Sequence, residues 1–281
     1  MVRRSLVLLL FVVPAFGQTQ QPAPTPAPPA PSSTTFSVPQ QVRRVDPPSA
    51  TATPEELERR ADELRELKFY TDSMDYYEAA MRKGGSVSLL SNKHGIAALG
   101  LMRYDVAKKD FERSLKNDKQ YAEAYNNLGV VYYIRKNLKR AIREYELAIK
   151  LRDTSASFHS NLGTAYFTHK DVEKAIVEYQ RALAIDPDVF EHRNTGGVAL
   201  QLISAEERAK HDFTMAKLFA RALVTTGNAG YADRSLIYLR KALEEGYDKI
   251  DSVYKDAEFA ALRKDPRFTE LMASRPPAIP Q

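Results

Sequence analysis

The sequence contains no cysteine among its 281 residues. This absence excludes a disulfide framework, a thiolate nucleophile, a cysteine-based zinc site and a lipid-bearing N-terminal cysteine. Positive charge is in slight excess only: the chain has 41 basic and 36 acidic residues, which gives a formal net charge of +5. So mild an imbalance gives no indication of a nucleic-acid partner.

Sequence patterns of common catalytic and metal sites are also missing. The five histidines show no HExxH spacing, and no serine lies in a GxSxG setting. The glycine pairs at 84–85 and 196–197 lack the spacing of a phosphate-binding loop and read as a turn and a tight helix contact. We therefore expect a protein that is not an enzyme and that uses no cofactor and no metal.

Residues 1–17 have the three parts of a secretory signal. Arg3 and Arg4 precede an apolar run over 6–13, and the chain becomes polar at Gln18. An uncleaved membrane anchor is the alternative, but spanning a bilayer takes roughly 20 apolar residues and this run has eight. We expect cleavage after residue 17 and an exported product, periplasmic or secreted, without a stable membrane span.

Residues 18–53 consist mainly of Gln, Pro, Ala, Thr and Ser, and they offer almost no apolar side chain to bury. Such a segment cannot form a core, so we predict a disordered, proline-rich linker. The alternative, a PxxP ligand for an aromatic groove, rests on composition alone. The last residues, 275–281, are expected to form a disordered tail.

An internal period of 34 residues follows the linker. Its windows are 54–87, 88–121, 122–155 and 156–189. The last two align without a gap, and Asn-Leu-Gly recurs in them at 127–129 and 161–163. A repeat of this length is typical of an antiparallel helix pair that stacks on its neighbours to bury its apolar side.

Small and aromatic residues recur at fixed places in these windows. The small ones are Ala61, Gly95, Gly129 and Gly163 at the eighth place and Ser73, Ala107, Ala141 and Ala175 at the twentieth, and the aromatic ones are Tyr77, Phe111, Tyr145 and Tyr179 at the twenty-fourth. We interpret the small residues as places where two helix backbones approach closely, since a bulky side chain there would overpack. The aromatic residues are predicted to fill the space between neighbouring repeats.

This pattern resembles the tetratricopeptide repeat family over residues 54–189. The resemblance implies an all-α fold, a right-handed α-solenoid of antiparallel helix pairs with a concave groove. It also implies a scaffold that binds a protein or peptide. The match is weakest in the first window, where Arg60 stands in place of the leucine found in the last two.

After Val189 the period changes. Residues 190–245 read as irregular repeat-like helices: a first helix over 190–202, a longer one over 203–223, a loop over 225–233 and a helix from Arg234 to Glu245.

Residues 246–274 read as a helical C-terminal cap, similar to the closing cap of many exported bacterial tetratricopeptide proteins. Asp265 is predicted as an N-cap and Pro266 as the first residue of its helix. The residues expected to cover the last apolar face are Phe259, Leu262, Phe268 and Leu271.

The inner wall of the predicted groove provides the candidate binding site. Asn127 and Asn161 recur at one-repeat spacing, and a side-chain amide that both donates and accepts suits the backbone of an extended peptide. The family resemblance implies this main-chain-binding role for these two positions. The other candidate contacts are Lys93, Asn126, Val130, Tyr133, Thr164 and Phe167. The alternative is that asparagine is simply a common residue at this place of the repeat.

Other functions remain as alternatives to a groove-binding scaffold. The chain could be a structural subunit of a cell-envelope assembly, held through its cap or through a convex face with basic residues such as Lys108, Lys139 and Arg140. An enzyme acting on cell-wall polymer would need a cleft of carboxylates. Family members that clamp a C-terminal carboxylate carry asparagine and lysine where Ile96 and Ser157 stand here, so we do not expect that activity.

Overall fold

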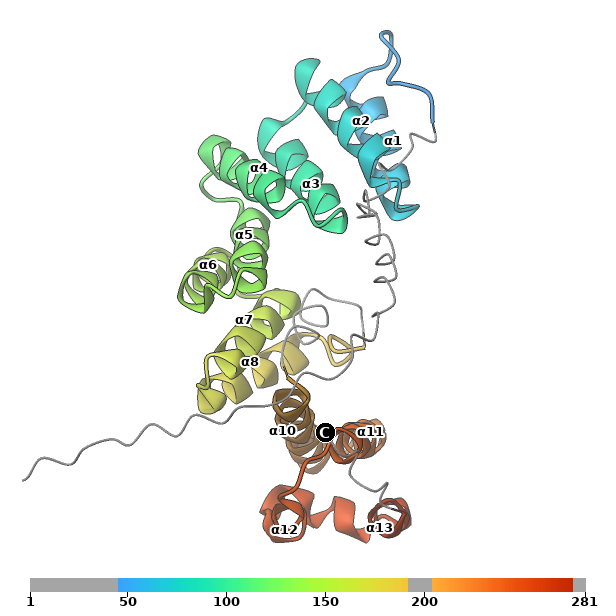
Figure 1. Ribbon diagram of the computed structural model, residues 1–281, viewed down its shortest axis with the longest axis vertical. Coiled ribbons are helices and arrows are strands. Elements are labelled where there is room, and N and C mark those ends of the chain that lie inside the picture. Colours follow the sequence, from blue (N-terminus) through green and yellow to red (C-terminus); the bar gives the residue numbers. More distant parts are fainter. Residues whose placement is uncertain (1–44, 192–203, 275–281) are drawn as a thin grey trace, which may run out of the picture. The chain divides into compact units, whose positions relative to one another are not determined.

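The computed structural model describes residues 45–191 and 204–274. Within these ranges the chain is all-α, and no strand occurs. Eight helices form four consecutive antiparallel pairs, so the fold is an α-solenoid of stacked helix pairs (Figure 1). The helices are α1 Pro54–Glu66, α2 Tyr70–Arg82, α3 Val87–Gly100, α4 Tyr104–Asn117, α5 Ala122–Ile134, α6 Leu138–Leu151, α7 Ala156–Thr168 and α8 Val172–Ile185. Among the described helices, none combines the length and apolar character needed to cross a membrane.

The two helices of each pair are joined by a turn of the same geometry. One residue in each turn has a left-handed backbone, and these residues, with their φ angles, are Lys68 (64°), Met102 (56°), Lys136 (58°) and Lys170 (74°). The next residue donates its N–H to the carbonyl five positions earlier, as Asn137 does to Tyr132 over 2.9 Å. This is the arrangement by which many helices end, and here it reverses the chain every 34 residues.

Aromatic rings pack directly on the bare backbone of the glycines at the eighth place. A Cβ added to Gly129 would lie 2.6 Å from the Tyr145 ring, and one added to Gly95 would lie 2.6 Å from the Phe111 ring. The glycine therefore makes room mainly for an aromatic side chain of its own repeat, which corrects our interpretation that it lets two backbones approach. Tyr145 also shares a core cluster with Leu162 of the next repeat, as expected for an aromatic between neighbours.

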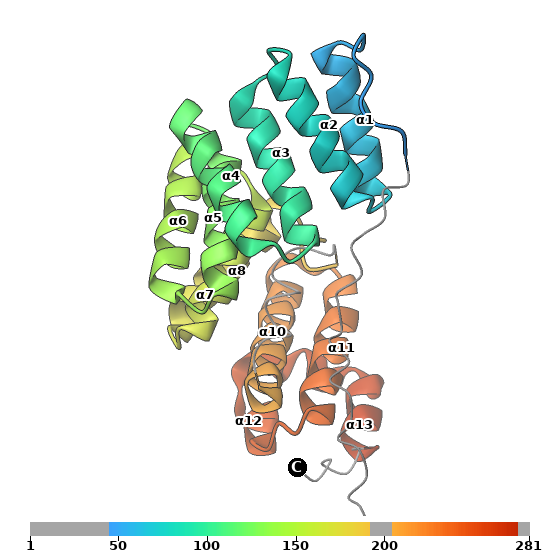
Figure 2. The same cartoon turned by 45° about the horizontal axis from the view of Figure 1, so that its top comes forward.

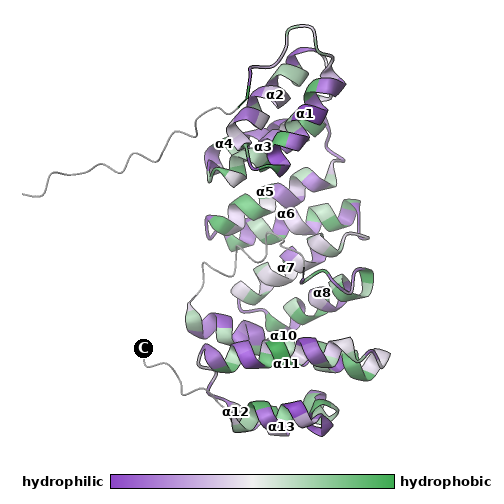
Figure 3. Cartoon of the chain, turned by 90° about the vertical axis from the view of Figure 1, so that its right-hand side faces the viewer, coloured by the Kyte–Doolittle hydropathy of each residue, from purple (hydrophilic) through white to green (hydrophobic). Residues whose placement is uncertain are grey.

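Each helix carries both hydrophobic and hydrophilic residues (Figure 3). The apolar ones form core clusters that join successive pairs, and the twentieth-place residues, such as Ala107 and Ala141, are completely buried between the helices. Because every pair shares its apolar side with the next, the stability of the array comes from stacking.

Beyond residue 203 a longer pair continues the chain. Helix α10, Ala205–Thr226, begins with a capping box between Ser204 and Glu207 and ends at Gly227, whose φ is 70°. Helix α11, Gly230–Glu244, begins four residues before the predicted Arg234. At its start the Asn228 side chain accepts a hydrogen bond from the N–H of Gly230 over 3.0 Å. Most of the helix predicted over 190–202 lies outside the described residues.

The C-terminal end consists of short helical segments that pack on α10 and α11 (Figure 2). Asp265 caps the last helix by accepting the N–H of Arg267 over 2.9 Å, and Pro266 is the first helical residue. The segments are α12 Ile250–Lys255, η1 Ala257–Ala260, η2 Leu262–Lys264 and α13 Pro266–Ala273. Phe259, Leu262, Phe268 and Leu271 are at most 3% exposed and belong to one core cluster with residues of α10 and α11.

The end of the predicted linker is attached to the first repeat. The Tyr76 hydroxyl donates to the carbonyl of Asp46 over 3.1 Å, and Lys83 Nζ donates to the carbonyls of Ala50, over 2.6 Å, and Ala52. Residues 45–53 therefore lie along α2, although composition predicted an unattached chain, because the contacts use backbone carbonyls that any residue carries. The predicted signal, the rest of the linker and the predicted tail lie outside the described residues.

Candidate functional site

Asparagine side chains form a hydrogen-bonded row across three first helices. Asn161 of α7 donates from Nδ2 to Oδ1 of Asn126 on α5 over 2.9 Å. Asn126 donates to Oδ1 of its neighbour Asn127 over 3.2 Å, and Asn127 donates to Oδ1 of Asn92 on α3 over 2.9 Å. We call these four residues the asparagine row. It links the second, third and fourth helix pairs on their first-helix side.

The row depends on a regular spacing between donor and acceptor. The sixth residue of a window reaches the fifth residue of the preceding window, 35 positions earlier, as Asn127 reaches Asn92. Lys93 and Glu58 are related in the same way at the first junction, where Nζ and Oε1 are 2.6 Å apart. The sequence analysis identified Asn126, Asn127 and Asn161 but not this contact. The signal for the contact is a polar residue at the fifth place of one window followed by a polar residue at the sixth place of the next window.

Most of the row is shielded from solvent. Asn92, Asn126 and Asn161 are 3, 7 and 4% exposed, and Asn127 is half-buried. A buried amide left without a partner costs about 1–3 kcal/mol, and the row supplies partners within the protein. The structure thus gives both predicted peptide contacts, Asn127 and Asn161, a role between repeats, and Asn127 is the row member with the most access to solvent.

The remaining predicted groove contacts are packed between first helices. Val130, Tyr133, Thr164 and Phe167 are each at most 6% exposed. The Tyr133 hydroxyl lies 2.7 Å from Thr168 Oγ1, and burial raises the pKa of Tyr133. Phe167 meets the ring of His211 edge-on with centroids 5.1 Å apart. These side chains build the wall behind the row, and their role as ligand contacts stays a prediction.

Lys93, the last predicted contact, is engaged by two carboxylates of the first repeat. Its Nζ lies 2.6 Å from both Glu58 Oε1 and Asp62 Oδ2. Burial alone would lower the pKa of Lys93, but hydrogen bonds to Asp62 and Glu58 outweigh it and raise that pKa. The Tyr77 hydroxyl donates to Asp62 over 2.6 Å, and burial together with this bond raises the pKa of Tyr77. Lys93 is therefore a charge that the protein itself compensates.

Two buried histidines each contact a carboxylate. The two carboxylates, Asp110 and Glu178, occupy equivalent places in their repeats. His94 Nδ1 lies 2.6 Å from Asp110 Oδ2, and His159 Nδ1 lies 2.6 Å from Glu178 Oε2. His159 stands at the place of Tyr125 in the preceding repeat, and its ring joins α7 to α8 by a polar contact. In the described ranges no cluster of three or more His, Cys, Asp or Glu is arranged to hold a metal ion.

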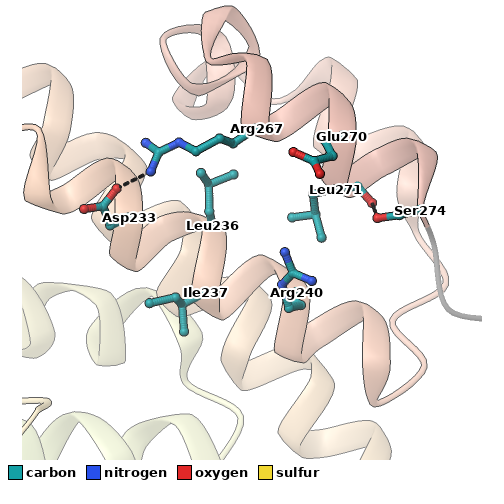
Figure 4. A pocket seen from close by; sticks show the side chains of 8 residues that line it. All are labelled: Asp233, Leu236, Ile237, Arg240, Arg267, Glu270, Leu271 and Ser274. Carbon is teal, nitrogen blue, oxygen red and sulfur yellow. Dashed lines mark hydrogen bonds and ion pairs between the residues drawn. The ribbon is translucent and has the colours of Figure 1, made fainter.

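A pocket of about 380 Å³ lies between α11 and α13 in the C-terminal segments (Figure 4). Buried Leu236 and Leu271 face each other across it. Arg267 NH1 lies 2.6 Å from Asp233 Oδ1, and the lining acids and bases are equal in number. This surface shows no preference for a ligand of either charge.

Comparison with known families identifies the repeated part of the chain. Models of the family described as tetratricopeptide repeat match residues 92–156 and 156–189. Residues 92–189 are tetratricopeptide repeats. The matched range contains the whole asparagine row. Tetratricopeptide repeats are scaffolds that bind proteins or peptides, and the matches indicate no enzyme family.

Solved structures of tetratricopeptide proteins are similar to this chain at low sequence identity. The C-terminal part of a TPR repeat-containing protein from Cytophaga hutchinsonii is 20% identical with a TM-score of 0.50, and the match covers 80% of this chain and 88% of that one. A thermophilic TPR protein from Thermus thermophilus is 18% identical with a TM-score of 0.47, covering 79% and 100%. YrrB, titled a TPR protein with an unusual peptide-binding site, is 16% identical with a TM-score of 0.43, covering 71% and 90%. None of the curated proteins matches the chain significantly.

Proposed function

We propose that this protein is a non-catalytic scaffold that binds an extended segment of a partner protein along α3, α5 and α7. The observation that supports this most directly is the asparagine row, which places amide groups of three repeats in one line. An asparagine amide has two N–H groups and an oxygen with two lone pairs. Asn127 uses one N–H and one lone pair within the row, which leaves one donor and one acceptor for the main chain of a ligand.

The row members have different roles in this proposal. Asn127, which is half-buried, contacts the ligand backbone, whereas the buried Asn92, Asn126 and Asn161 hold its amide in position. Lys93 does not serve as an anion clamp, because Glu58 and Asp62 take two of its three donors and balance its charge. The arrangement favours the main chain of an internal segment over a terminal carboxylate.

A selection from random peptides displayed on phage tests the proposal. The bait is the chain without residues 1–17, beside an Asn127→Ala variant and a matched Asn117→Ala control. Asn117 is exposed at the end of α4, and its side chain bonds only to its own helix, at the Arg113 carbonyl 2.8 Å away. Melting curves confirm that all three baits are folded.

We expect peptides that bind the parent and the Asn117→Ala control equally and the Asn127→Ala variant at least tenfold more weakly, the loss of one or two hydrogen bonds. Equal binding by all three baits would place the interface elsewhere. In that case the cap or the convex second-helix face would become the contact, as in a structural subunit of an envelope assembly.

We also propose that the protein is exported. The support is the sequence pattern of residues 1–17, with paired arginines before a short apolar run. N-terminal sequencing of the protein from fractionated cells tests this. A mature chain that starts at Gln18 outside the cytoplasm supports export, and a chain found in the cytoplasm with its first 17 residues intact contradicts it.

A further inference from the structure

We propose that the junction of the third and fourth repeats carries a second binding site, for a partner segment that presents an acidic side chain next to an apolar one. A pocket of about 730 Å³ lies there, between the C-terminal ends of α6 and α8 and the start of α7. It is lined in part by second-helix residues, away from the asparagine row, so it goes beyond the groove function proposed above.

Two residues that line the pocket are smaller than their equivalents in the preceding repeat. His159 stands where the preceding repeat has Tyr125, and Ala184 stands where it has Lys150. The His159 ring is drawn inward by two contacts: Nδ1 lies 2.6 Å from Glu178 Oε2, and Nε2 lies 2.9 Å from the carbonyl oxygen of Asp153. The ring is thereby fixed at the base of the pocket, and the volume of a larger side chain stays open.

Apolar side chains supply part of the lining. Ile149 and Leu151 come from the end of α6 and are partly buried, and Ile185 comes from the end of α8 and is 42% exposed. Ile185 is one of few large apolar side chains with that much exposure in the described residues. Covering these side chains with an apolar group removes their surface from water, which favours binding.

Cations predominate among the exposed charges at the rim. Lys150 is exposed and forms no ion pair with a described residue, and the Arg181 side chain is 58% exposed. Asp153 is the one exposed acid in the lining. Glu178 is 10% exposed and is already engaged by Arg181, 2.7 Å away, and by His159. An acidic group on the ligand would therefore meet Lys150 at the edge of an apolar surface, together with the exposed part of the Arg181 guanidinium, whose NH1 is paired with Glu178.

Methyl NMR of the chain without residues 1–17, labelled on isoleucine, tests the site directly. The probe is the capped dipeptide N-acetyl-Leu-Asp-amide, with N-acetyl-Leu-Asn-amide as its uncharged isostere and N-acetyl-Gly-Asp-amide as the form without an apolar side chain. We expect Leu-Asp to shift the methyl resonances of Ile149 and Ile185 but not that of Ile237 on α11. A ligand of this size should bind with a dissociation constant on the order of 1 mM. Both control peptides should bind at least fivefold more weakly.

Variants at exposed rim positions test the charge of the site without altering buried residues. We expect Lys150→Gln to weaken binding of Leu-Asp at least threefold and to leave binding of Leu-Asn unchanged. Ala184→Glu, which places a carboxylate at an exposed position in the lining, should also weaken binding of Leu-Asp. Lys139→Gln, an equally exposed lysine at the start of α6, should change nothing.

Two outcomes would overturn the proposal: equal binding of the Asp and Asn peptides, or unchanged binding of Leu-Asp by the Lys150→Gln variant. The Asn127→Ala variant should bind Leu-Asp like the parent. A failure here therefore leaves the groove function untouched, and a failure of the groove test leaves this site untouched.

Discussion

The ring of Tyr145 occupies the space into which a side chain on Gly129 would point, 2.6 Å from where its Cβ would lie. The same relationship holds between Gly95 and Phe111 and between Gly163 and Tyr179. Real Cβ atoms do not approach a ring so closely, so the glycine and the aromatic residue depend on each other. The period of the sequence thus reflects a steric pairing inside the second, third and fourth repeats, while the first repeat has Ala61 at this place.

Replacing Gly129 by alanine should destabilise the protein by about 1–3 kcal/mol, the usual range for overpacking. Helix propensity acts in the opposite direction by about 1 kcal/mol, so the sign itself tests the contact. Urea unfolding followed by circular dichroism measures the effect. In a Tyr145→Leu background the penalty should vanish, and additive effects of the two changes would argue against the pairing.

A second prediction concerns the left-handed residues in the turns. Lys136 has a φ of 58°, a conformation that costs a residue with a side chain about 1–2 kcal/mol and costs glycine nothing. Since glycine loses more chain entropy on folding, Lys136→Gly should stabilise by up to about 1 kcal/mol. Arg143→Gly, in the middle of α6, is the matched control and should destabilise by about 1 kcal/mol. Loss of stability in both variants would show that the turn does not require the left-handed conformation.

Glu144 provides a pH-dependent prediction. Burial raises the pKa of Glu144, and the nearby Arg143 and Arg140 offset this only in part. A carboxyl group whose pKa is raised on folding adds stability in its protonated form, and this stability is lost as the pH rises through the raised pKa. At pH 7 the ionised group is therefore unfavourable.

Glu144→Gln should accordingly stabilise the protein at pH 7 by a few tenths of a kcal/mol, a small value because the group is partly exposed. The gain should disappear below about pH 4, where glutamate is protonated in both states. Urea unfolding across this range measures it. Glu173→Gln, at the start of α8 where a carboxylate favours the helix N-terminus, should give no gain. A gain from Glu144→Gln that is independent of pH would exclude this explanation.

A further prediction concerns the loss of stability when the central residue of the asparagine row is replaced. Asn126 accepts from Asn161 and donates to Asn127, so Asn126→Ala removes both hydrogen bonds at the centre of the row. We expect a loss of about 1–3 kcal/mol in urea unfolding. Asn117→Ala, at an exposed asparagine, should change the stability by less than about 0.5 kcal/mol. Similar small effects in both variants would mean that the row contributes little to the stack.

Helix pairs and the packing of the cap could be predicted from the sequence because they depend on residue size at fixed intervals. Examples are Gly129 and Tyr145, whose sizes fit each other, and Phe268, which is large, apolar and buried. The start of α11 was missed because residues 225–233 were read as a loop from their residue types, whereas the helix begins at Gly230.

The candidate site could be predicted from the sequence only in part. The recurrence of Asn127 and Asn161 is visible in the sequence, and it marks the first-helix side of the repeats. Their partners are not visible, because a period of 34 aligns equivalent residues and hides a contact made across 35. The attachment of residues 45–53 to α2 uses main-chain carbonyls and leaves no trace in the residue types.

The two hydrogen bonds that join repeats in the asparagine row both run from the later repeat to the earlier one, and the bond from Lys93 to Glu58 has the same direction at the first junction. Bonds aligned in this way polarise one another. The row therefore holds the remaining N–H and lone pair of Asn127 in one orientation. A partner backbone would meet this donor and this acceptor in one order when running parallel to the repeats and in the reverse order when antiparallel, so the scaffold carries an intrinsic sense of direction.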